Sequence, residues 1–126
     1  MLVDPIDLLV GYLRTRPEIP DGAPTGDMVG REAGDTTVYL EPTGGMRMVR
    51  YAMDRFDVEY QVYERDREDA AKLAFTVRSI LLEDLPGTMI GDNQVLDVAE
   101  ISAPHYDPDE SSREQVYIGE IGLFIN

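Results

Sequence analysis

The clearest structural signal in the chain spans residues 56–81, which read FDVEYQVYERDREDAAKLAFTVRSIL. Apolar and polar side chains alternate over residues 56–63, a pattern typical of a strand with one buried and one solvated face. After Asp66, a residue type that caps helices, apolar side chains recur at helical spacing as far as Leu81. The segment therefore predicts a strand that leads directly into an amphipathic helix.

A second helix is predicted at the start of the chain, over residues 4–14. Asp4 suits the N-cap position and Pro5 the first helical position. Residues 15–35 are rich in Pro, Gly, Asp and Thr and predict a long loop. Loops of this length in compact domains are usually functional or ordered by a partner.

Three further strands are predicted, at residues 36–40, 95–101 and 114–125. The last of these has apolar residues on both faces, which indicates a central strand or one covered by another subunit. Residues 46–55 are ambiguous, and residues 104–112 predict a polar connection with two prolines.

The order helix, loop, two strands, helix, two strands predicts an α+β fold. We expect an antiparallel sheet of about four strands with two helices packed on one face. The 126 residues fit a single domain, 1–126.

The chain is strongly acidic, with 25 Asp and Glu against 11 Lys and Arg and a net charge of −14. This charge disfavours binding to a phosphate backbone. It favours solubility, or a surface that lies near DNA without binding it. The absence of cysteine excludes disulfides and thiolate chemistry. The chain has no run of 18 apolar residues and no signal-peptide pattern, so we expect no membrane span and a cytoplasmic place of assembly.

The sequence offers little catalytic or metal-binding chemistry. His105 is the only histidine and lies in a proline-rich acidic stretch, which favours a solvated loop side chain. Asp107, Asp109 and Glu110 lack the spacing of a calcium loop. No phosphate-binding glycine motif is present. We therefore predict no enzyme, with no catalytic, cofactor-binding or metal-ligating residue.

Basic residues cluster at one place in this acidic chain. Arg47, Arg50 and Arg55 are three of the eleven Lys and Arg residues and lie within nine positions. Such a patch suits docking to an acidic partner or to a neighbouring copy. Chance scatter with internal charge balancing is the alternative.

The strand and helix of residues 56–81 resemble the central elements of the tail terminator proteins of long-tailed bacteriophages. The resemblance extends to the N-terminal helix, to Val38-Tyr39-Leu40 before Thr43-Gly44-Gly45, and to Ile101-Ser102-Ala103-Pro104 before the last strand. It implies a ring, typically of six copies, that caps the tail tube, stops its polymerisation and presents the surface that joins the head.

The resemblance also implies the partners and the location. These are other copies of the chain in a homohexamer, the major tail tube protein and a head-completion or stopper protein, at the tail–neck junction of the virion. DNA would pass through the ring without sequence-specific binding, and no membrane or cofactor is implied. We expect the last strand and the loops 15–35 and 43–55 to supply contacts, with these candidate residues: Arg47, Arg50, Tyr51, Arg55, Tyr117, Ile121 and Leu123.

Two other functions remain open at this point. One is a different neck ring, such as the head-side stopper. The other is an acidic DNA-mimic module that binds a basic protein, whose carboxylates would be spaced like phosphates on one face. The acidic residues here are dispersed along the sequence, which favours the ring protein.

Overall fold

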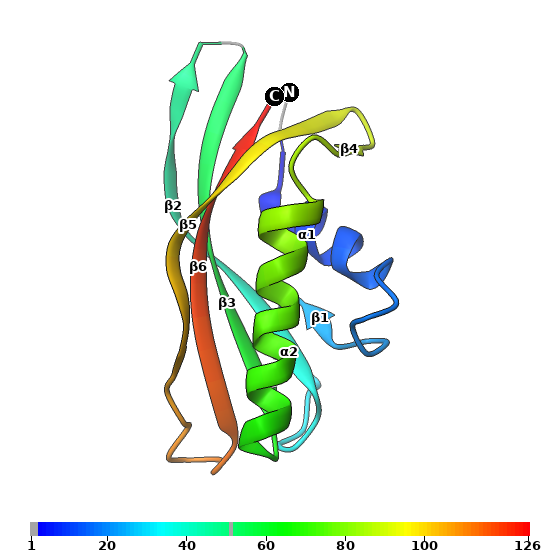
Figure 1. The fold of residues 1–126 in the computed structure, drawn as a ribbon, viewed down its shortest axis with the longest axis vertical. Helices are drawn as coiled ribbons and strands as arrows, with labels where there is room; N and C mark the ends of the chain where they lie inside the picture. The colour runs from blue at the N-terminus through cyan, green and yellow to red at the C-terminus, as the bar shows by residue number, and fades with distance from the viewer. Residues whose placement is uncertain (1–2, 51) are drawn as a thin grey trace.

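The computed structural model describes residues 3–50 and 52–126 and shows an α+β fold. Two α-helices pack on one side of a curled sheet of six strands (Figure 1). The elements in chain order are α1 (Pro5–Arg14), β1 (Pro24–Thr25), β2 (Thr37–Val49), β3 (Met53–Glu64), α2 (Arg67–Ser79), the π-turn η1 (Ile80–Asp84), β4 (Met89–Ile90), β5 (Asn93–Tyr106) and β6 (Gln115–Ile125).

Both predicted helices are confirmed, together with their caps. The Asp4 carboxylate accepts a hydrogen bond from the backbone N–H of Ile6 at 2.9 Å. The Asp66 carboxylate accepts one from the N–H of Asp69 at 3.1 Å. These carboxylates satisfy amide groups that have no partner inside the first helical turn. Neither helix in the described part of the chain has the length and apolarity needed to cross a membrane.

The sheet is larger than predicted and is mixed rather than purely antiparallel. Its order is β1-β2-β3-β6-β5-β4. The four long strands are the predicted ones, and each neighbouring pair among them is antiparallel. The two-residue strands β1 and β4 were not predicted, and β1 runs parallel to β2. Two residues are too few to produce a periodic sequence pattern, so they escape detection.

Two boundaries also differ from the prediction. Among the ambiguous residues 46–55, residues 46–49 and 53–55 are strand and belong to the end of a long β2–β3 hairpin. Strand β5 continues to Tyr106, so the expected connection 104–112 begins as strand. Pro104 is tolerated there because β5 has almost no neighbour on its outer side, where a missing N–H breaks no ladder.

The core lies between the helices and the facing side of the sheet. Strand β6 is central, as predicted, because β3 and β5 flank it. The side chains of Ile121 and Leu123 on β6 and of Leu9 on α1 are fully buried. The side chain of Leu73 on α2 is almost completely buried. The opposite side of the sheet, which we call the open face, carries neither helix (Figure 1).

Candidate subunit interface

The long strands β2 and β5 have only the two-residue strands β1 and β4 on their outer sides, which leaves most of their length without a neighbouring strand. Within residues 3–50 and 52–126, β1 pairs only with Val38 and Tyr39 of β2, and β4 pairs only with Asn93 and Gln94 of β5. Pro42 and Pro104 each lack an N–H, and the N–H and C=O of Val95 already bond to Thr88 and Gly87. The stretches able to accept a strand are therefore about residues 43–49 and 96–103. Unpaired N–H and C=O groups on such edges are a template for pairing with another chain.

Exposed apolar side chains gather on these two edge strands. Nine large apolar side chains are exposed in the part of the chain that the structure describes, and six of them lie on β2 or β5. Natural edge strands are commonly protected by charge, whereas here apolar groups flank the open backbone. The six residues are Met46, Met48 and Val49 on β2 and Leu96, Ile101 and Tyr106 on β5.

The end of the β2–β3 hairpin (residues 43–56, described at 43–50 and 52–56) forms a projection that we call the arm. It extends well past the end of α2 (Figure 1). A Cβ atom at Gly45 would lie 2.1 Å from the Arg55 carbonyl oxygen, and Gly45 has φ of 143°, so glycine lets the two strands close here. With three arginines and one aspartate the arm carries +2. Since the whole chain carries −14, the remaining residues carry −16.

The arm contains four of the predicted contact residues. Arg47 and Arg50 are exposed near its end, while Tyr51 lies outside the described residues. Arg55 lies on the open face, where its Nε donates to Asp57 Oδ1 at 2.8 Å and its guanidinium lies 5.7 Å from the Phe124 ring centre. The predicted basic patch is therefore divided, with Arg47 and Arg50 towards the end of the arm and Arg55 paired within the sheet.

The other three predicted contact residues lie in the interior. Ile121 and Leu123 have no exposed side-chain surface, and Tyr117 is 8% exposed, with its hydroxyl accepting from Arg67 Nη1 at 3.1 Å. The backbone of β6 pairs with strands on both sides. These three side chains are therefore not available to a neighbour, because β6 has neither a free edge nor a free apolar face toward the helices.

The predicted loop 15–35 is fixed to the body by a buried ion pair. Arg31 Nη1 donates to Glu114 Oε1 at 3.1 Å, Arg31 Nη2 contacts Oε2, and the Gly34 N–H donates to Oε2 at 3.1 Å. The Arg31 guanidinium also lies 4.8 Å from the Tyr63 ring centre. The loop thus has intramolecular partners, and its contact with another chain stays a prediction.

Burial and hydrogen bonding act in opposite directions on Glu114, whose residue is 4% exposed. Burial raises the pKa of its carboxyl group, but the hydrogen bonds from Arg31 and Gly34 and the charge of Arg31 outweigh burial and lower the pKa below its ordinary value. The carboxylate is therefore ionised in the folded protein at neutral pH.

Three glutamates line up across the open face. Glu41 of β2 lies opposite Glu59 of β3, which in turn lies opposite Glu120 of β6. Gln61 Nε2 donates to Glu59 Oε1 at 2.7 Å and Thr43 Oγ1 donates to Glu120 Oε2 at 2.6 Å. Like charges directly opposite one another are unfavourable, so this row gives the open face a local excess of negative charge.

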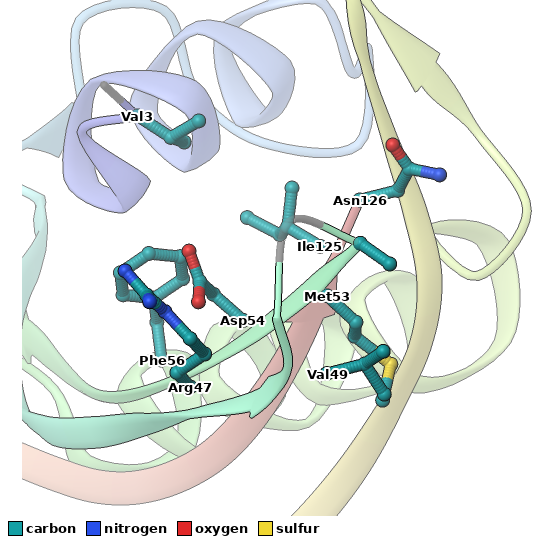
Figure 2. A pocket seen from close by; sticks show the side chains of 9 residues that line it. Val3, Arg47, Val49, Met53, Asp54, Phe56, Ile125 and Asn126 are labelled. Carbon is teal, nitrogen blue, oxygen red and sulfur yellow. The ribbon is translucent and has the colours of Figure 1, made fainter. Parts of the chain in front are cut away.

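A small cavity lies at the base of the arm, on the helix side. Figure 2 shows Arg47 and Asp54 beside Phe56, with Val49 and Met53 across the opening. Its volume is about 160 Å³, well below the roughly 300–1,000 Å³ of typical small-molecule sites. We therefore assign it no ligand. It is lined by Val3, Arg47, Val49, Ala52, Met53, Asp54, Phe56, Ile125 and Asn126.

The described residues show no assembled metal site. In residues 3–50 and 52–126, no three His, Asp or Glu side chains converge on a point where an ion could bind. His105 lies exposed on β5, opposite Ile118 of β6, rather than in the loop expected from sequence.

The open edges were missed at the sequence level, although a signal existed. Pro42 and Pro104 both lie inside strands, and proline within a sheet is confined mainly to edge strands. With the strand boundaries known, these prolines identify β2 and β5 as the edges. No protein-family model matches this chain, and a search of curated proteins finds no match.

Proposed function

We propose that this chain is a non-enzymatic assembly protein that forms a ring and terminates a bacteriophage tail tube. The observation that carries the proposal is the pair of open edges, β2 and β5, both flanked by exposed apolar side chains. A monomer with one open edge tends to make a dimer. Two different open edges on one sheet allow each copy to bind two neighbours.

The contact between β2 of one copy and β5 of the next is heterologous, because two different surfaces meet. A heterologous contact closes into a ring when its rotation closes, and otherwise forms a filament. The sheet of each copy is curled (Figure 1), so sheets joined edge to edge would turn relative to one another. Joining the sheets around a closed ring would also remove both open edges.

Termination then follows from the two faces of such a ring. One face is complementary to the last ring of the tube, and the other differs from it, so no further tube subunit adds. The net charge of −14 supports passage of DNA without binding, because acidic surfaces repel phosphates. None of these steps requires catalysis.

The test measures assembly of the purified chain, alone and with its tube protein. Native mass spectrometry and negative-stain microscopy are expected to show a ring, with six copies as the expected number, and tubes that stop growing when the ring is added. A monomer at all concentrations, with and without tube protein, would contradict the proposal. A monomer that instead captures a basic protein would favour the DNA-mimic alternative.

Matched substitutions test the edges themselves. Met48→Lys and Ile101→Lys place a charge on β2 and β5, where it opposes strand pairing. Phe75→Lys is the control, since Phe75 is 44% exposed, as Met48 is, but lies on α2, outside the sheet and outside the loops expected to make contacts. We expect the two edge variants to remain folded monomers and the control to assemble normally.

A ring that binds head proteins but leaves tube growth unchanged would indicate the head-side stopper.

A further inference from the structure

We infer that the arm of one copy binds a defined acidic corner of the neighbouring copy, formed by residues 89–98, and that this contact sets the register of the ring. The inference rests on the proposed ring. The corner comprises β4, the turn through Gly91 and Asp92, and the start of β5.

The direction of the strands decides which parts of the two edges meet. Successive neighbours in the series β2, β3, β6, β5 are antiparallel, so β2 and β5 run in opposite directions within one copy. Rotation about a ring axis that runs along the strands leaves these directions unchanged. Strand β2 of one copy therefore meets β5 of the next in antiparallel orientation. The end of β2 lies beside Leu96, where the unpaired part of β5 begins after Val95.

The internal register places the arm and the corner at the same end of the sheet. Asp54 of the arm lies opposite Ile125, and Ile125 lies opposite Val95 at the start of β5. The arm and the corner of adjacent copies are thus at the same height along the ring axis. The register between adjacent copies would have to shift by many residues to separate the arm from the corner.

Charge complementarity supports the same pairing. The arm carries +2, whereas the corner has Asp92 and Asp97 and no basic residue, giving −2. Arg47, Asp92 and Asp97 are all exposed. Among the residues described, Arg47 takes part in no ion pair within its own copy. We place Arg47 of one copy against Asp97 of its neighbour, because an antiparallel contact with Met48 beside Leu96 brings these two residues together and opposite charges across an interface fix its register.

The arm and the corner also carry exposed apolar side chains that can pack against each other. Met46, Met48 and Val49 are 62%, 44% and 49% exposed on the arm. Met89 and Leu96 are 59% and 40% exposed on the corner. Methionine is unbranched and adapts to irregular surfaces, which suits a contact between two narrow projections. Burial of these side chains against one another would stabilise the contact through the hydrophobic effect.

Cross-linking tests the contact directly, because the chain has no cysteine of its own. A chain carrying Met48→Cys and Leu96→Cys is treated with a short bismaleimide at concentrations where the ring forms. We expect a ladder of covalent multimers up to the copy number of the ring. An equimolar mixture of the two single variants should stop at dimers, because each chain then has one reactive end.

A second cysteine pair tests the direction. Met48→Cys combined with Tyr106→Cys joins the arm to the far end of β5, and we expect no ladder. A ladder from this pair and none from the first would overturn the inference while leaving the ring intact. A ring by native mass with no ladder from either pair would overturn it as well.

A charge exchange tests Arg47 and Asp97. Arg47→Glu alone and Asp97→Arg alone should each raise the concentration at half-assembly on the order of tenfold, and the double exchange should restore it. Additive losses in the double variant would overturn the pairing. Absence of any ring in the unsubstituted protein contradicts the proposed function itself, so the two failures are distinguishable.

Discussion

Tyr60 lies directly opposite Gly119 in the β3–β6 ladder, and its ring occupies the space that a side chain at position 119 would need. A Cβ atom at Gly119 would lie 2.3 Å from Tyr60 Cζ. The Tyr60 side chain is fully buried beneath the helices, so it has no free space into which to move. This pair explains a glycine in the middle of the central strand, where glycine is otherwise unfavourable.

Gly119→Ala is expected to destabilise the fold by about 3 kcal/mol, since overpacking a well-packed core typically costs 1–3 kcal/mol and the buried ring cannot retreat. Urea unfolding measures the change. Gly11→Ala is the matched control, because position 11 is exposed on α1 and a Cβ there meets nothing within 4 Å. The control should gain up to about 1 kcal/mol from helix propensity. Equal effects at both positions would contradict the packing argument.

The Arg31–Glu114 pair predicts an asymmetry between single and double variants. Arg31→Met leaves the Glu114 carboxylate buried without its cation, which should cost about 3 kcal/mol. The double variant Arg31→Met, Glu114→Gln should be more stable than Arg31→Met alone, because the unpaired charge is gone. A double-mutant cycle in urea measures the coupling. Additive losses would show that the pair does not fix the loop.

The same pair predicts a pH dependence. The pKa of Glu114 in the folded protein lies below its ordinary value of 4.5. A lowered folded-state pKa contributes stability that is complete above the unfolded-state pKa and is lost as pH falls through the folded-state pKa. The stability difference between wild type and Glu114→Gln should therefore be constant from pH 7 to about 5 and shrink below about 4.5. A constant difference down to pH 3 would contradict the assignment.

The glutamate row on the open face predicts a stabilising substitution. Glu59 lies between Glu41 and Glu120 in register. Glu59→Gln removes two unfavourable cross-strand neighbours and keeps an oxygen able to accept from Gln61, so we expect a gain of about 0.5 kcal/mol. The gain should shrink at high salt, which screens exposed charges. Glu110→Gln, in the exposed connection after β5, is the control and should change little.

The boundary between prediction and structure is clear in the β2–β3 hairpin. Residues 46–55 gave no definite pattern because the β2 half of the arm is exposed on both faces, so no burial imposed a period of two on its sequence. The arm's role as a projection became apparent only from its position beyond α2 (Figure 1). The three arginines are close in sequence, but the structure gives them different surroundings. Arg47 and Arg50 lie towards the end of the arm, whereas Arg55 pairs with Asp57 within the sheet.

The predicted contact residues on β6 lie in the core of the fold. Ile121 and Leu123 are apolar, and sequence alone cannot tell an apolar core residue from an apolar interface residue. The order of strands decided this point, since it placed β6 between β3 and β5 under α2. The same order exposed β2 and β5 as edges, which local pattern does not encode.

The sequence by itself determined the two helices, their caps, the four long strands and the acidic character of the chain. Each of these depends on interactions between residues close in sequence or on simple composition. Only the tertiary structure decided which strands lie at the edges, where Arg31 finds Glu114, and why Gly119 faces Tyr60. Those relationships join residues up to 83 positions apart, and such contacts arise from the packing of the whole sheet against its helices.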